Sequence, residues 1–325
     1  MNPGFTQRIE YPMPGYLAAL RLTHFANLLG AAICLAMVCL SARSQAADYP
    51  PCQCRSFCDC LWCRETLFTW ESVADVREEQ SDPNEEKKFE LDRPDFIEAS
   101  STIGCGRVAI EAGYTYTFNN DGGVQTISHS YPETLFRIGM LAEWFELRIA
   151  QNFAAEQTRQ GGTTSRESGA EDLYLGIKLG MTKQAEWLPE SALILQMTVP
   201  TGANPFTADE VLPGLNYVYS WKLSEEWDMA GSTAANRAVE AASNDYTEIA
   251  QAWAFGYALA DDARMYVEWY GLFPHGAADV RPQHYGDLGL AWFLTPNLEV
   301  DVRIGIGLNE SADDYFTGAG GGIRF

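Results

Sequence analysis

The sequence is poor in basic residues and in histidine. It holds 22 lysines and arginines against 44 aspartates and glutamates, with only 4 histidines, for a formal charge of -22. Such an acidic surface repels nucleic acid and anionic headgroups, so we expect no nucleic-acid partner. G-x-S-x-G, Walker and Rossmann patterns are also missing after residue 46. We therefore predict that the chain is not an enzyme, and we expect no catalytic residue, no cofactor and no metal site.

Long apolar runs are scarce as well. The single long run, Phe25 to Leu40, is shorter than the roughly 20 residues of a membrane helix. Arg21 precedes it, and the small-x-small motif that ends at Ala46 follows it. This order predicts a cleaved secretory signal over residues 1–46, with an N-terminal anchor helix as the alternative. Cleavage removes three arginines and one glutamate and leaves a formal charge of -24.

Cysteines cluster before the main part of the chain. Residues 47–104 are expected to form a periplasmic leader and linker, and residues 105–325 a single barrel domain. The six cysteines after the signal are Cys52, Cys54, Cys58, Cys60, Cys63 and Cys105. Cys63 is followed by Arg64, so the C-x-x-C-H haem-attachment pattern is missing. Disulfides or disorder are favoured in an exported protein, and a thiolate metal site is the alternative.

A short turn pattern recurs five times in the rest of the chain: an apolar residue, a small residue and then polar residues. The copies begin at Leu141, Met181, Leu223, Leu259 and Leu294. Each interval contains two segments of alternating polarity separated by a longer polar stretch. Five short turns at one end and long loops at the other predict twelve antiparallel strands. This arrangement is typical of an outer-membrane β-barrel.

Alternation within the strands assigns their two faces. In Leu298–Leu308 every even residue is a large aliphatic and every odd residue is charged or glycine. A soluble all-β fold could show the same pattern. Aromatic residues near strand ends, such as Tyr114, Trp144 and Trp253, suit the girdles of a membrane barrel and favour a transmembrane all-β fold.

The predicted strands cover residues 105–118, 134–140, 144–152, 172–181, 190–199, 212–222, 226–235, 246–258, 263–272, 285–294, 297–308 and 316–325. The polar stretches 119–133 and 153–170 are expected to be solvated outer loops.

Charged residues on the inward face are candidates for lining a lumen. They are Glu111, Arg137, Glu146, Arg148, Lys178, Glu268, Asp287, Glu299, Asp301, Arg303 and Arg324. Such residues either form cross-strand salt bridges or select solutes in a channel, and the sequence does not rank the two roles. Inward glycines, including Gly113, Gly139, Gly289 and Gly305, indicate open space or close backbone packing.

The segment Asp92-Arg93-Pro94-Asp95-Phe96-Ile97-Glu98 resembles the start of the MetA-pathway phenol-degradation family, which commonly has Thr where Ile97 stands. The resemblance spans Asp92 to Phe325 and extends to the turn pattern and the last strand. It implies an exported barrel that takes up solutes. The candidate plug segment consists of Asp92, Arg93, Pro94, Asp95, Phe96 and Glu98, and inward carboxylates could hold its arginine.

We therefore predict a channel in the outer membrane of a Gram-negative-type envelope, for passive uptake of small solutes, with aromatic or hydrophobic compounds as candidates. A lipid-modifying enzyme and a structural barrel without transport are the alternatives. The partners expected are outer-membrane lipid, a small-molecule solute and the membrane assembly machinery, which the last strand would engage through Phe325.

Overall fold

The computed structural model describes residues 66–68, 89–240 and 244–325. The predicted signal and the cysteine cluster of residues 52–63 lie outside these residues. No helix within the described ranges is long and apolar enough to cross a membrane. The strands are β1 (Val108–Asp121), β2 (Val124–Gly139), β3 (Phe145–Gln160), β4 (Thr163–Ala170), β5 (Leu173–Thr182), β6 (Glu190–Val199), β7 (Leu212–Lys222), β8 (Trp227–Val239), β9 (Asp245–Ala260), β10 (Ala263–His275), β11 (Gln283–Thr295), β12 (Leu298–Gly307) and β13 (Tyr315–Arg324).

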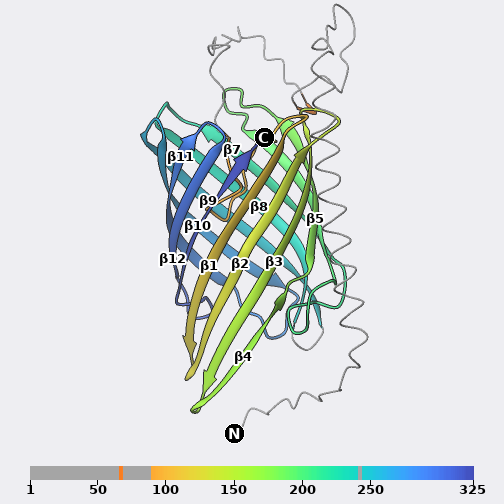
Figure 1. The fold of residues 1–325 in the computed structure, drawn as a ribbon, viewed down its shortest axis with the longest axis vertical. Coiled ribbons are helices and arrows are strands. Elements are labelled where there is room, and N and C mark those ends of the chain that lie inside the picture. The colour runs from red at the N-terminus through yellow and green to blue at the C-terminus, as the bar shows by residue number, and fades with distance from the viewer. Residues whose placement is uncertain (1–65, 69–88, 241–243) are drawn as a thin grey trace, which may run out of the picture. The chain divides into compact units, whose positions relative to one another are not determined.

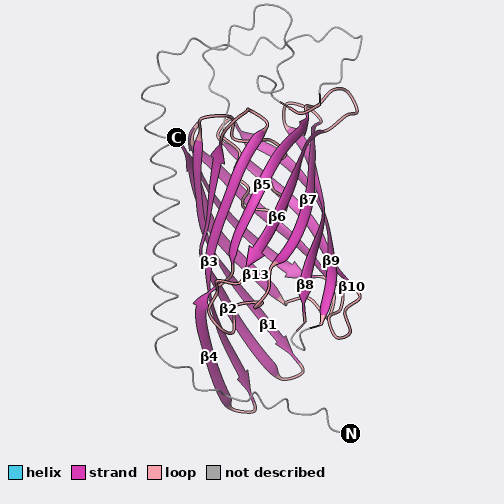
Figure 2. Cartoon of the chain, turned by 90° about the vertical axis from the view of Figure 1, so that its right-hand side faces the viewer, coloured by secondary structure: helices cyan, strands magenta, loops and turns pink. Residues whose placement is uncertain are grey.

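Twelve of these strands close into an antiparallel barrel, as predicted. Neighbouring strands pair in order around the ring, β2 pairs with β3, and β13 closes on β1. The additional strand β4 pairs only with the distal part of β3, from Phe153 to Gln160, and the proximal part of β3 pairs with β5. Strands β1 to β4 extend beyond the other strands at the end opposite the C-terminus (Figures 1 and 2).

The two faces of the wall differ in polarity as the alternation predicts. On β12, Val302, Ile304 and Ile306 are 42%, 57% and 53% exposed, whereas Glu299 and Asp301 are each only 2% exposed. Apolar side chains facing outward and charged ones facing inward suit a barrel surrounded by lipid. Trp144 is an exception to the predicted girdles, because it is 8% exposed and lies on the inward face with Glu146.

The stretches 119–133 and 153–170, predicted as solvated loops, are instead long hairpins. Strands β1 and β2 meet at Gly122-Gly123, and β3 and β4 meet at Gly161-Gly162. All four glycines have positive φ, between 56° and 86°, which two-residue hairpin turns require and larger residues disfavour. The prediction was wrong because these strand ends are polar on both faces, so they show no alternation.

Candidate functional site

Residues 89–104, which we call the lumen segment, run inside the barrel (Figure 1). At its first end, Phe89 and Leu91 are buried together with Ile103. In its middle, the ring of Phe96 stacks on that of Tyr270 from β10 with 4.5 Å between centroids. The inward face around these apolar contacts carries both uncharged residues, such as Ala252 and Ala254, and a set of buried charged side chains.

The main contact of the lumen segment is a buried charge cluster. Arg137 of β2 and Arg148 of β3 are directly opposite each other, an arrangement in which like charges repel. Glu146 lies between them, with Oε1 2.9 Å from Arg137 Nε and 3.2 Å from Arg148 Nη1. Asp92 of the lumen segment supplies a second bridging carboxylate, which pairs with both arginines and with Lys178.

Asp92 is therefore held as an anion. Burial would raise the pKa of Asp92, but the three neighbouring cations hold it well below its usual range. Its backbone N–H also donates to both carboxylate oxygens of Glu111, at 3.1 Å each. In this cluster the wall contributes three cations and two carboxylates, and Asp92 and Glu98 from the lumen segment supply the remaining negative charge.

Further contacts hold the lumen segment to strands β2, β10 and β12. Arg93 pairs with Glu133 of β2 at 2.6 Å and with Asp301 of β12 at 3.4 Å. The guanidinium of Arg303 donates to the carbonyl oxygen of Pro94 at 2.7 Å. Glu268 of β10 accepts the backbone N–H of Phe96 at 2.7 Å and that of Ile97 at 3.2 Å. Wall charges thus bind both the side chains and the backbone of the segment.

The sequence-predicted lumen residues lie as follows. Nine are buried inside the barrel, namely Glu111, Arg137, Glu146, Arg148, Lys178, Glu268, Asp287, Glu299 and Asp301. Arg303 is partly exposed beside Pro94, and Arg324 donates to Asn297 at the short-turn end. The candidate plug residues Asp92, Arg93, Pro94, Asp95, Phe96 and Glu98 all lie in the lumen segment.

Sequence reasoning missed several wall residues that contact this segment, among them Glu133 and Glu190. Glu133 was assigned to an outer loop, but a bulge between Tyr131 and Thr134 turns it toward Arg93. Glu190, at the start of β6, accepts a hydrogen bond from Ser100 at 3.0 Å. Glu190 is the first residue of β6, so the alternation along that strand does not assign it clearly to one face. The bulge at Glu133 is likewise not visible in a period-two pattern.

Several inward glycines provide room for other atoms. A Cβ atom on Gly139 would stand 1.8 Å from the carbonyl oxygen of Gly104 in the lumen segment. A Cβ on Gly289 would stand 2.0 Å from the ring of Tyr266, and one on Gly305 2.1 Å from the ring of Phe316. The sequence indicated either open space or close packing at the inward glycines, and these three positions are closely packed.

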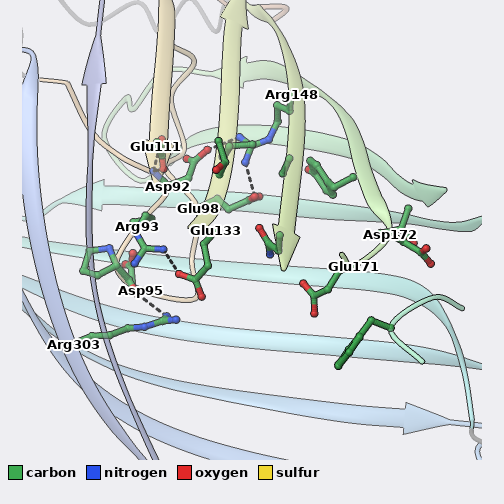
Figure 3. Close-up of a pocket in the computed structure, with 18 of the residues that line it drawn as sticks. Asp92, Arg93, Asp95, Glu98, Glu111, Glu133, Arg148, Glu171, Asp172 and Arg303 are labelled. Atoms are coloured by element: carbon green, nitrogen blue, oxygen red, sulfur yellow. Dashed lines mark hydrogen bonds and ion pairs between the residues drawn. The ribbon is translucent and has the colours of Figure 1, made fainter. Parts of the chain in front are cut away.

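A cavity of about 580 Å³ lies against the lumen segment. Its lining holds seven carboxylates and three guanidinium groups, together with Tyr174, Phe206 and other uncharged residues. Glu133 and Glu171 lie on opposite sides of the space, and Arg93, Asp95 and Arg303 lie at its edge (Figure 3). Among the described residues, no three His, Cys, Asp or Glu side chains are grouped as metal ligands.

Comparisons with known proteins agree with the barrel fold. The family model described as "Putative MetA-pathway of phenol degradation" matches residues 91–325. No curated protein matches the sequence. An outer membrane channel from Pseudomonas putida F1 is similar in structure, with TM-score 0.57 and 13% identity over 72% of this chain and 99% of that one. The translocator domain of autotransporter NalP from Neisseria meningitidis has TM-score 0.46 and 11% identity, over 72% and 91%.

Proposed function

The chain belongs to the family whose model matches residues 91–325, and we propose that it is an outer-membrane channel closed by its own lumen segment. In this proposal small solutes enter the cavity that lies against the lumen segment, and they cross passively when the segment moves or rearranges. The observation that carries it is the nature of the contacts: the segment is bound mainly through ion pairs and hydrogen bonds to a polar wall. Water and solutes can replace such contacts, unlike those of an apolar core.

The charge of the cavity supports a mild preference for cations. Seven carboxylates against three guanidinium groups line it, and the chain as a whole carries -22. Low-dielectric walls focus such a potential and enrich counter-ions at the entrance. Salt screens the field, so the preference weakens as ionic strength rises.

The family description names phenol degradation, so small aromatic compounds are one candidate solute class. Tyr174, Phe206 and Leu135 give the cavity an apolar portion that an aromatic ring could contact. Most of the lining is charged, which also favours polar and cationic solutes.

A structural barrel without transport is the second candidate, because the lumen segment fills part of the interior as that function would require. A lipid-modifying enzyme would need a serine activated by a histidine. His129 instead has Tyr114 as a partner, with 2.7 Å between the hydroxyl oxygen and Nδ1. The absence of enzymatic activity stays a prediction.

Reconstitution of the full mature chain into planar bilayers tests the proposal. We expect small currents, a reversal potential in a KCl gradient that favours K⁺, and loss of this preference near 1 M salt. Correct insertion is checked by the altered gel mobility of the unheated barrel. Clear anion selectivity would contradict the charge argument. A correctly folded protein that carries no current, even when contacts of the lumen segment are weakened, would favour the structural barrel.

A further inference from the structure

The barrel wall contains a slot that fits one guanidinium group. Gly113 of β1 and Gly320 of β13 are directly paired, and both lie on the inward face. A Cβ atom on Gly113 would stand 2.2 Å from Cζ of Arg93, and one on Gly320 would stand 2.5 Å from Nε. The guanidinium group therefore lies against bare backbone on two neighbouring strands, where any larger residue would exclude it.

Two carboxylates complete the slot. Asp301 of β12 is the residue paired with Gly320 on the other side, and its Oδ2 lies 3.4 Å from Arg93 Nε. Glu133 approaches from β2, with Oε2 2.6 Å from Nη1. Guanidinium and carboxylate groups in such contacts form charge-assisted hydrogen bonds. Shape and charge together match a planar cation that carries N–H donors.

Arg93 leaves part of the hydrogen-bonding capacity of the slot unused. Asp301 is 2% exposed, and its Oδ1 has no hydrogen-bond partner among the described residues. Nη2 of Arg93 likewise has no hydrogen-bond partner in the described part of the chain. Asp92, by contrast, has three cations and two backbone hydrogen-bond contacts. The Arg93 contact is thus the less complete of the two attachments.

The slot is reachable from the cavity that lies against the lumen segment. Glu133 and Arg93 both line that cavity, which Glu171 and Asp172 border on the other side (Figure 3). The backbone of Glu133 has φ of 43°, in the left-handed region that residues with a side chain rarely adopt. Strained backbone of this kind persists where the surroundings over-determine it, often at ligand sites. Here it turns the carboxylate toward both Arg93 and the cavity.

We propose that Glu133 and Asp301 form a binding site for guanidinium and primary ammonium solutes, and that Arg93 occupies this site as an internal ligand in the closed state. A cationic solute in the cavity competes with Arg93 for Glu133 and so releases one side of the lumen segment. The proposal names the solute class of the channel and rests on the function proposed above.

The test compares two cations at equal ionic strength, methylguanidinium and tetramethylammonium, which has no N–H donor. In the Arg93→Ala variant of the full mature chain the slot is vacant. Methylguanidinium is therefore expected to raise the thermal unfolding midpoint of this variant at concentrations about tenfold or more below those of tetramethylammonium. In the unmodified protein, methylguanidinium on the outer side is expected to increase the current, because it competes with Arg93.

Matched variants locate the effect. The double variants R93A/D301N and R93A/E133Q should lose the selective stabilisation. Arg303→Ala should not gain it, since the guanidinium of Arg303 donates to the carbonyl oxygen of Pro94 and to the hydroxyl of Thr115. If R93A does not fold, the competition in the unmodified protein, compared with E133Q and D301N, decides the same question.

Equal responses to the two cations, or a selective response that survives both double variants, would overturn the site. Failure of the site is distinguishable from failure of the channel. If the proteins conduct but show no guanidinium selectivity, the channel stands and the site falls. If none conducts, the channel proposal falls, and the thermal measurement still decides whether the site exists.

Discussion

Substitution of Asp92 by asparagine should release the lumen segment. The change keeps the size of the side chain but removes the charge that Arg137, Arg148 and Lys178 share. The asparagine oxygen can still accept the backbone N–H of Ala99, which lies 2.9 Å from Asp92 Oδ1. The local turn of the segment is therefore preserved, and the loss falls on its contact with the wall.

The magnitude follows from the burial of the cluster. Removing one partner of a buried ion pair typically costs about 3–5 kcal/mol, because the other charges lose their compensation. Glu146 still lies between the two opposed arginines, so we take the lower end, about 3 kcal/mol. Each 1.4 kcal/mol is about a tenfold change in an equilibrium constant, so the ratio of docked to undocked segments should fall roughly a hundredfold.

Single-channel recording measures this ratio as the fraction of time spent open. Asp121→Asn is the matched control, because this substitution removes the same charge from a residue that is exposed at the end of β1. A correctly inserted D92N barrel with the open fraction of the unmodified protein would refute the claim that Asp92 holds the segment. The low pKa of Asp92 also predicts the pH dependence. The contribution of Asp92 to docking is lost only as pH falls through that depressed pKa, so the charge of Asp92 should not change between pH 5 and pH 8.

Four further predictions concern the glycines of the slot, the charge of Asp95, the ion preference and membrane insertion. Gly113→Ala and Gly320→Ala should raise the current by excluding the Arg93 side chain, whereas Gly286→Ala should not, because its Cβ would meet no atom closer than 3.5 Å. Burial raises the pKa of Asp95 to about 6, so above that pH its charged form disfavours docking of the lumen segment. Protonation at lower pH favours docking, so the current should fall as pH is lowered from 8 to 5. The D95N variant should show a weaker pH dependence of the current. The reversal potential of the unmodified protein should indicate mild cation preference that declines with salt. Deletion of Phe325 should leave the protein in the periplasm, as fractionation would detect; unchanged membrane insertion would contradict a role of Phe325 in assembly.

Lipid explains why so much of the barrel could be predicted. Each membrane-crossing strand must present apolar side chains outward, so the alternation in Leu298–Gly307 fixes its faces without knowledge of its neighbours. The five short turns likewise mark where pairs of strands join. Where a strand is not covered by lipid, this constraint does not apply. The distal parts of β1 to β4 are polar on both faces, and the informative signal there was the pair of Gly-Gly turns, at Gly122-Gly123 and Gly161-Gly162.

The lumen segment could be predicted only in part, because alternation says which side chains face inward and not what they meet. Arg93 was considered as a partner of inward carboxylates, but Glu133 depends on a bulge that no periodicity encodes. One signal was nonetheless present. Arg137 and Arg148 are equally distant from the turn that begins at Leu141, so a regular hairpin places them opposite each other, as the observed register does. Two opposed arginines inside a barrel require a carboxylate from elsewhere. Of the two wall carboxylates, Glu111 pairs with Arg137 and Glu146 bridges both arginines. A second bridging acid is therefore favoured, and in the structure that acid is Asp92.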